Sequence, residues 1–150
     1  MAISPKYTLD TNLFIDGMRD KAQCEALTEF HLRHGPKEYL CSVVALELRM
    51  GCRTPEALNT VLEKTINRFA KPGRMITPSW SAWNSAGDTL AQLAKRDGML
   101  VGEMPRSFVN DVLIAHCCRE EGVTLVTRNA KDFERIGKVV KFGWVAGWVR

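Results

Sequence analysis

The segment Lys6-Tyr7-Thr8-Leu9-Asp10-Thr11-Asn12 decides how this sequence is expected to fold. Residues 6–9 predict a short β-strand, because β-forming residues follow Pro5, which is typical of the start of a strand. The strand runs directly into Asp10. Parallel sheets carry their ligand and catalytic sites at the carboxyl ends of the strands. Asp10 is therefore either the N-cap of a helix that opens at residues 13–15 or part of a functional site, and this segment leaves both interpretations open.

Composition narrows the class of protein. The 150 residues are expected to form one domain, residues 1–150, with a hydrophobic core, and a 45% hydrophobic and 25% charged composition is ordinary for a soluble protein. No apolar run would span a bilayer and the N-terminus lacks a secretory signal, so we expect a cytoplasmic protein with no membrane partner. The five cysteines lack the paired spacing of a zinc site, and Cys117 and Cys118 are expected to pack in the core.

Predicted strands and helices alternate along the chain. After the first strand, we expect strands at residues 38–41, 74–77, 123–127 and 139–142. The helical segments are residues 12–30 with a break at 20–21, 43–50, 55–69, 79–96, 108–121 and a short helix from 132. This alternation predicts an α/β fold, with a central parallel β-sheet covered by helices on both faces.

Four single residues carry predictions about packing and helix starts. Ser42 and Ser107 are expected to be N-caps, because each is a small hydroxyl residue directly before a predicted helix. Trp80 and Trp83 lie on the apolar face of the helix at residues 79–96, so we expect them to anchor the core. Stacking of these indoles on nucleic-acid bases is the weaker alternative.

Two further acids stand in apolar surroundings. Glu47 is the only carboxylate in a helix that is apolar nearly all round, and Asp111 is flanked by hydrophobic residues on both sides. A carboxylate near a helix N-terminus gains about 0.3–1 kcal/mol from the helix dipole, which does not offset the several kcal/mol needed to bury it unpaired. Both acids therefore need partners. Asp16 and Asp20 are instead expected to be solvated, and the lone His116 to be structural.

In the predicted fold, Asp10, Glu47 and Asp111 converge, because strand ends and the starts of the following helices share one edge of the sheet. The polar residues 127–132 should reach the same edge. Three converging carboxylates repel one another, and protonation or a cation must relieve that repulsion. A site of oxygen donors without cysteine or histidine selects a hard cation, Mg²⁺ or Mn²⁺. Such a cation can activate water and stabilise charge on a phosphoryl group.

Four segments of the chain resemble, in order, the signature segments of PIN-domain ribonucleases. They are residues 7–12, 42–47, 108–111 and 125–129. The resemblance is closest to the VapC-like toxins of bacterial type II toxin–antitoxin pairs and covers essentially the whole chain. It implies a PIN-like fold, a divalent metal, and endonucleolytic cleavage of RNA by metal-activated water.

The resemblance also implies roles for individual residues. By position, Asp10, Glu47 and Asp111 match the three acidic residues of the family. The fourth acidic position falls on Asn129, which carries no charge, and Asp132, three residues on, is the alternative ligand through a water.

Polar and basic residues beside the acids are expected to orient the substrate. They are Thr11, Asn12, Thr127 and Arg128, with Arg106 and Lys131 as further phosphate contacts. When the three clustered acids are set aside, the chain has 14 acidic and 21 basic side chains. The outer surface is therefore expected to be more cationic than the net charge of +4 suggests.

The resemblance implies partners as well. They are an RNA substrate, a second copy of the chain in a homodimer, and a cognate antitoxin that covers the acidic cleft and lies in an apolar groove formed by residues 12–30 and 56–69.

Two other functions remain as alternatives. A phosphoryl-transfer enzyme of the haloacid-dehalogenase kind would need an Asp two residues after Asp10, where this chain has Asn12. The second alternative is a catalytically weakened PIN-like protein that binds or processes RNA outside a toxin–antitoxin pair.

Overall fold

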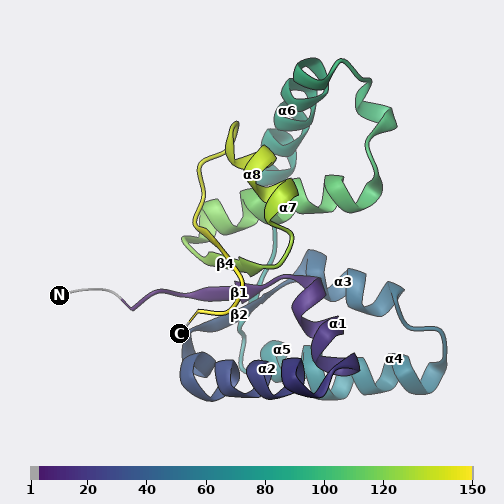
Figure 1. The fold of residues 1–150 in the computed structure, drawn as a ribbon, viewed down its shortest axis with the longest axis vertical. Helices are drawn as coiled ribbons and strands as arrows, with labels where there is room; N and C mark the ends of the chain where they lie inside the picture. The colour runs from purple at the N-terminus through teal and green to yellow at the C-terminus, as the bar shows by residue number, and fades with distance from the viewer. Residues whose placement is uncertain (1–3, 150) are drawn as a thin grey trace.

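A five-stranded parallel sheet forms the centre of the computed structural model, which describes residues 4–149 (Figure 1). The strands are β1 (Tyr7–Leu9), β2 (Glu38–Cys41), β3 (Met75–Ile76), β4 (Thr124–Thr127) and β5 (Trp144–Ala146). Their order in the sheet is β3-β2-β1-β4-β5, and every neighbouring pair is parallel. β1, which precedes Asp10, therefore lies in the middle. The predicted α/β class with a central parallel sheet is confirmed.

Helices cover both faces of this sheet. Those preceding β3 are α1 (Thr11–Arg19), α2 (Lys21–His34), the 3₁₀ turn η1 (Gly35–Lys37), α3 (Ser42–Met50), α4 (Pro55–Val61), the π-helical turn η2 (Leu62–Ile66) and α5 (Asn67–Ala70). Those following β3 are α6 (Trp80–Asp97), the 3₁₀ turn η3 (Val101–Glu103), α7 (Arg106–Glu121) and α8 (Ala130–Gly137). In Figure 1, α2, α4 and α5 lie on one side of the strands, and α6, α7 and α8 on the other.

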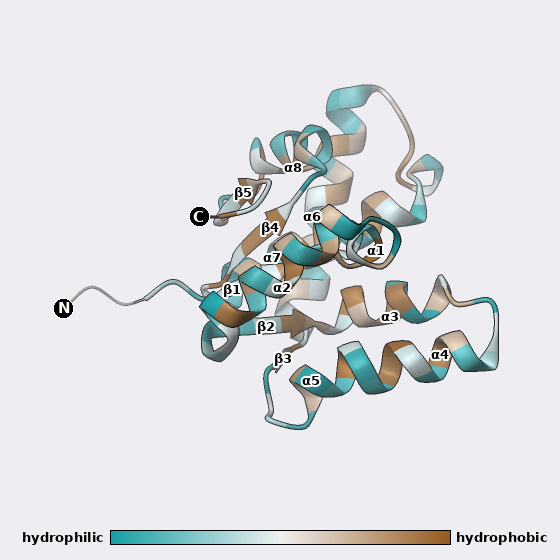
Figure 2. Cartoon of the chain, turned by 60° about the horizontal axis from the view of Figure 1, so that its bottom comes forward, coloured by the Kyte–Doolittle hydropathy of each residue, from teal (hydrophilic) through white to brown (hydrophobic). Residues whose placement is uncertain are grey.

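The core fills the space between the sheet and the two helical layers. Leu9, Leu40 and Leu125, from three adjacent strands, are completely buried. In Figure 2, hydrophobic residues colour β4 and recur along α3 and α4. Cys117 and Cys118 are buried in α7, as predicted from their apolar surroundings. Among residues 4–149, no helix is both long and apolar enough to cross a bilayer.

A buried polar pair that the sequence did not reveal joins α2 to the start of β2. His31 Nδ1 lies 2.6 Å from Glu38 Oε2, and both side chains are buried. Arg74 donates a hydrogen bond to the main-chain oxygen of Glu38 at 2.7 Å. Buried polar groups are stable only when they are paired, so this contact fixes how α2 sits against the sheet.

The predicted fifth strand at residues 139–142 is wrong. The strand instead comprises Trp144–Ala146, paired with Leu125–Thr127 of β4. The ladder begins where Leu125 N–H donates to the Gly143 carbonyl at 3.0 Å. Val140 is buried, so the apolar pattern at residues 139–142 indicated burial and not strand pairing.

The two predicted serine N-caps are also wrong, by one or two residues. α3 begins at Ser42 itself, after Cys41, and α7 begins at Arg106, after Pro105. Neither preceding residue makes a side-chain capping bond. Helix boundaries are uncertain by this amount when they are read from sequence, because several small polar or proline positions compete for the cap.

Trp80 and Trp83 do not anchor the core. Their side chains are 79% and 53% exposed. The buried face of α6 instead carries mostly small residues in its first half, with Ala82 and Ala86 almost completely covered. Because small side chains let α6 approach α7 closely, there is no room for an indole between the two helices, and the tryptophans lie outside.

Candidate active site

Asp10 is a helix cap, as one interpretation of its segment predicted, and it also lies at the centre of a polar network. Its Oδ1 accepts a hydrogen bond from the Thr11 N–H at 2.8 Å, which caps α1. Its Oδ2 accepts from the Thr127 hydroxyl at 2.7 Å and from the Asn12 amide at 3.4 Å. The side chain is only 4% exposed. Burial is the main cause that raises the pKa of this carboxyl, against the hydrogen bonds from Thr127 and Thr11.

Two neutral donors hold the carboxylate of Glu47. The Thr11 hydroxyl donates to Oε1 at 2.7 Å, and the Asn110 amide donates to Oε2 at 3.3 Å. The contacts tie α3 to the start of α1 and to α7. Asn110 was not predicted as a site residue, and the available signal was that it stands directly before Asp111 in an apolar helix.

Asp111 is the most electrostatically perturbed carboxyl of the site. Burial raises its pKa to about 8, and the nearby charges of Asp10, Glu47 and Asp132 act in the same direction. Its Oδ2 accepts a hydrogen bond from the Asn129 amide at 3.2 Å. The structure therefore brings the three predicted acids, together with Asp132, into one electrostatic neighbourhood.

Asn129 lies between two of these carboxylates. Its Nδ2 donates to Asp111 Oδ2 at 3.2 Å and to Asp132 Oδ2 at 3.0 Å. Its main-chain N–H donates to the Thr127 hydroxyl at 2.9 Å, which in turn donates to Asp10. The amide thus supplies partial positive charge where two acids meet. In this arrangement Asn129 stabilises both carboxylates by donating hydrogen bonds to them.

The donor set fits a hard divalent cation, although the side chains are not gathered around one point. Carboxylate, amide and hydroxyl oxygens from Asp10, Glu47, Asp111 and Asn129 are the types that Mg²⁺ and Mn²⁺ prefer. Among residues 4–149, no three acidic, histidine or cysteine side chains lie close enough together to hold a metal ion. Entry of a cation would require the Asn129 amide protons to leave the two carboxylates.

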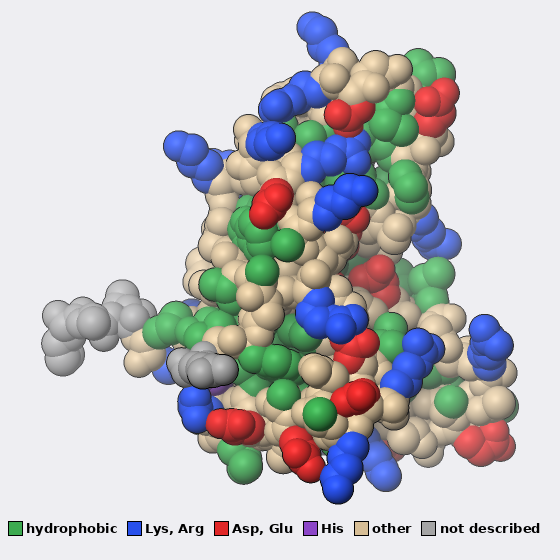
Figure 3. All heavy atoms as spheres, in the orientation of Figure 1, with side chains coloured by type: hydrophobic (Ala, Val, Ile, Leu, Met, Phe, Trp, Pro, Cys, Tyr) green, Lys and Arg blue, Asp and Glu red, His purple; other side chains and the backbone are tan. Residues whose placement is uncertain are grey.

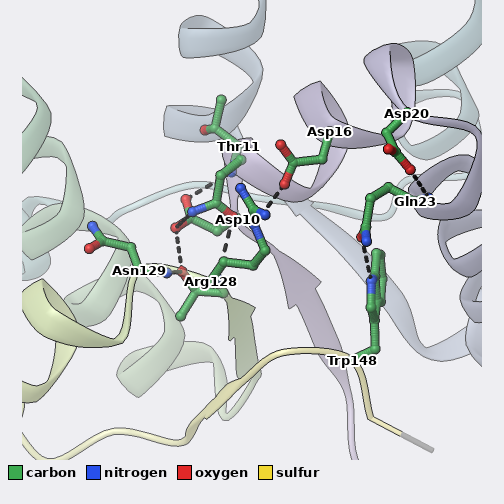
Figure 4. A network of polar contacts seen from close by, with 10 residues as sticks. Asp10, Thr11, Asp16, Asp20, Gln23, Arg128, Asn129 and Trp148 are labelled. Atoms are coloured by element: carbon green, nitrogen blue, oxygen red, sulfur yellow. Dashed lines mark hydrogen bonds and ion pairs between the residues drawn. The ribbon is translucent and has the colours of Figure 1, made fainter.

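Arg128 lies at the edge of this network, where it meets Asp16 of α1 (Figure 4). Its Nε is 2.7 Å from Asp16 Oδ2, and its main-chain N–H donates to Asn12 Oδ1 at 3.5 Å. The prediction that Asp16 is a solvated surface acid is wrong, since its side chain is 22% exposed and paired. Asp20 is exposed and caps α2 through Gln23.

Two other polar residues stand apart from the acids. His116 is buried and bonded to the Thr89 hydroxyl at 2.8 Å, in agreement with a structural role. Lys131, on α8, pairs with none of the described acids.

Comparisons with known proteins place this geometry in context. Residues 7–139 match the PIN domain family. The chain is 32% identical over 143 residues to Ribonuclease VapC2 of Haemophilus influenzae, covering 93% of this chain and 98% of the relative. It is 30% identical over 142 residues to the tRNA(fMet)-specific endonuclease VapC of Shigella flexneri, with the same coverage.

Solved structures give a matching result. The chain resembles one in DNA-bound VapBC from Salmonella typhimurium with a TM-score of 0.71 and 27% identity, covering 95% of this chain and 98% of that one. VapBC-1 from nontypeable Haemophilus influenzae shares the fold with a TM-score of 0.66 and 22% identity, covering 93% and 96%.

The raised pKa of Asp111 predicts how stability depends on pH. Because the folded carboxyl titrates near pH 8 and the unfolded one near 3.8, the folded chain binds more protons between these values. The free energy of unfolding of the metal-free protein should therefore fall as pH rises through this window, by up to about 1.4 kcal/mol per pH unit from this group. Thermal unfolding in a chelator from pH 4 to pH 8.5 measures it.

Asp111→Asn should remove most of that dependence. The variant should be more stable than the wild type at pH 8 and differ little from it at pH 4. Asp88→Asn, which removes an exposed acid of α6, is the matched control and should leave the slope unchanged. If the free energy of unfolding changes with pH in the same way for the wild type and Asp111→Asn, the raised pKa does not belong to Asp111.

Asn129→Asp should lower the stability of the metal-free protein and raise its affinity for a divalent metal. The change removes two amide hydrogen bonds and adds a fifth carboxylate to the four already there, so the metal-free protein should unfold at lower temperature at pH 7.5. Mn²⁺ should bind more tightly, by about tenfold or 1.4 kcal/mol. Calorimetric titration of Mn²⁺ and Mg²⁺ into the wild type, Asn129→Asp and Asp132→Asn tests both claims. If only Asp132→Asn alters affinity, position 132 and not 129 faces the ion.

Proposed function

This chain belongs to the PIN-domain family, and on that premise we propose that it is a divalent-metal-dependent endoribonuclease, acting in the cytoplasm as the toxin of a type II toxin–antitoxin pair. The observation that supports the proposal is that Asp10, Glu47 and Asp111 lie near enough to influence one another's charge, with Thr127 and Thr11 bonded to two of them. The names of the relatives, a ribonuclease and a tRNA-specific endonuclease, support RNA as the substrate.

In the proposed reaction, Asp10 and Asp111 would hold Mg²⁺ or Mn²⁺, and Glu47 would bind the ion or its water. When bound, a divalent ion would supply an activated water and positive charge for a phosphodiester. Thr127 and Thr11 fix the carboxylates of Asp10 and Glu47 through hydroxyl donors, so that little reorganisation is needed when substrate binds. Asn12 holds Asp10 and the main chain of the β4–α8 loop together.

The remaining chemistry is the displacement of one oxygen by another at phosphorus. Glu47, anchored by Thr11 and Asn110, positions the attacking water. The water oxygen bonds to phosphorus while the bond to the 3′-oxygen breaks and that oxygen gains a proton. The products are a 5′-phosphate and a 3′-hydroxyl.

The distribution of charge suits a chain that binds an RNA backbone. Figure 3 shows Lys and Arg side chains interspersed with Asp and Glu over the face in view, and not confined to one patch. Cations that contact phosphates release counterions from the nucleic acid, which makes the affinity sensitive to salt.

Asp10→Asn and Asp111→Asn should each lower RNA cleavage by at least about a hundredfold, the scale of losing a positioned catalytic group. Both variants should remain folded, because Asn keeps the size of Asp and relieves repulsion. The measurement is cleavage of a labelled tRNA pool with Mg²⁺ or Mn²⁺, with a chelator lane and Asp88→Asn as controls. Cleavage near the wild-type rate by either purified variant would refute the assignment of the site.

One observation favours a second candidate, an RNA-binding protein with weakened catalysis. Asn129 fills the position where the family carries its fourth acid, and it bonds to Asp111 and Asp132 as a donor. The same assay separates the two functions, because a protein of the second kind would bind RNA without cutting it at any metal concentration.

The proposed partners are a second copy of the chain, which the resemblance to VapC-like toxins implies, and an antitoxin, which the likeness to chains in VapBC structures supports. A groove of about 520 Å³ lies between α1, the end of α3 and α4, close to where the sequence predicted one. Its apolar lining includes Ile15, Met18, Leu48 and Val61, with Arg19, Arg53 and Lys64 beside them. We propose that an amphipathic helix of the antitoxin fills this groove.

Met18→Asp should abolish binding of the antitoxin and leave RNA cleavage unchanged. Met18 lines the groove and is 54% exposed, so a charge there opposes an apolar partner without disturbing the core. Met50→Asp is the matched control, since Met50 is 53% exposed on α3 and does not line the groove. Co-expression with the proposed antitoxin, followed by a pull-down, measures whether the partner binds. Light scattering measures the oligomeric state. If both variants lose antitoxin binding equally, or if Met18→Asp keeps it, the groove is not the antitoxin-binding site.

A further inference from the structure

Arg128 is attached to the rest of the site at two points. Its main-chain N–H donates to Asn12 Oδ1 at 3.5 Å, next to Asp10, and its side chain ends at Asp16 of α1. Figure 4 shows this side chain reaching from the end of β4 to α1, with Asp10 and Thr11 beside it. The guanidinium group is thus held at the border of the acidic network and not inside it.

The pairing with Asp16 uses one nitrogen of Arg128. The Nε atom lies 2.7 Å from Asp16 Oδ2 in an ion pair that lacks the alignment of a hydrogen bond, and none of the hydrogen bonds among the described residues involves the two terminal amino groups. The Asp16 side chain is 22% exposed and its Oδ2 is covered, whereas the Arg128 side chain is 53% exposed. The guanidinium is therefore paired at its Nε with a largely covered carboxylate, while its terminal amino groups have no partner among the described residues.

This asymmetry distinguishes the pair from an ordinary surface contact. Arg33 and Glu29 of α2 also form an ion pair, at 2.8 Å, but their side chains are 49% and 68% exposed. Such exposed pairs are screened by solvent and separate easily. The carboxylate that Arg128 meets is much less exposed than Glu29, so solvent screens the Arg128–Asp16 pair less.

We propose that Asp16 is a positioning residue that presents the terminal amino groups of Arg128 to an RNA phosphate adjacent to the one that is cleaved. A guanidinium group binds phosphate oxygens through two parallel N–H donors, which suits the two free amino groups. Because the side chain is already immobilised, less rotamer entropy is lost when the phosphate binds. The inference rests on the proposed function, because it requires RNA to lie across the acidic residues.

A double-mutant cycle tests the proposal. The single variants are Asp16→Asn and Arg128→Gln, and the double variant combines them, all in an Asp111→Asn background with Mg²⁺ present. The affinity for a labelled single-stranded RNA is measured by fluorescence anisotropy at several salt concentrations, after circular dichroism and thermal unfolding confirm folding. Glu29→Gln and Arg33→Gln form the matched control cycle, which removes the same charges from an exposed pair.

The expected result is that Arg128→Gln weakens RNA binding by roughly three- to tenfold at low salt. The slope of log affinity against log salt concentration should become shallower by about one, the value for one lost phosphate contact. Asp16→Asn should also weaken binding although it removes a negative charge, and it should have no weakening effect once Arg128 is Gln. The control cycle should show no coupling. An Arg128→Lys variant should not restore the affinity, because lysine has no Nε for Asp16 to hold while it presents two donors.

Two results would overturn the proposal. Tighter binding by Asp16→Asn only when Arg128 is present would show that Asp16 restrains the arginine, and additive effects would show that the pair is not coupled to RNA. Neither result depends on cleavage. If the wild type cuts RNA and the cycle shows no coupling, the positioning role alone is wrong, whereas a coupled cycle in a chain that cuts no RNA would leave it standing and reject the nuclease.

Discussion

The burial of neighbouring carboxyl groups is the constraint on which the rest of this structure depends. The fold buries Asp10 and Asp111 and brings Glu47 and Asp132 close enough to act on the charge of Asp111. Burial alone disfavours the charged form of an acid, and each neighbouring charge adds to the penalty. The stability lost there must be regained elsewhere, and the fully buried leucines of the three central strands are one source.

The chain limits this penalty with uncharged donors from neighbouring elements. Thr127 donates to Asp10, Thr11 and Asn110 donate to Glu47, and Asn129 donates to two acids at once. These donors lie on α1, on α7, at the end of β4 and in the connection after it. The hydrogen bonds that moderate the charge therefore also join these elements to one another.

Local sequence patterns were enough to predict the parallel sheet and to single out Asp10, Glu47 and Asp111. These residues are recognisable because a charge interrupts an apolar run, which is a local signal. The errors have non-local causes. Trp80 and Trp83 are outside because the small residues of α6 bring α7 close, and the predicted last strand is wrong because Val140 is buried without strand pairing, while the pairing with β4 begins at Trp144.

The contacts that the sequence did not reveal are likewise set by tertiary structure. Asn110 approaches Glu47 across 63 positions of the chain, Asp16 meets Arg128 across the acidic site, and the His31–Glu38 pair depends on the angle between α2 and β2. Even where the local sequence marked one member, as for Glu47 and Arg128, it did not indicate which residue would be the partner, because the partner is distant in the chain or looks like an ordinary polar residue.

The positions of the four tryptophans determine what intrinsic fluorescence can report for this protein. Trp80 and Trp83 face water in the folded chain, so their emission changes little when α6 unfolds. Trp148 packs beside Phe30 and donates to Gln23, and Trp144 lies in β5 beside Phe133. A shift in emission wavelength would therefore follow the docking of the C-terminal segment on α2 and β4. A fluorescence transition and a circular dichroism transition that fail to coincide would reveal that this segment separates from the sheet before the helices melt.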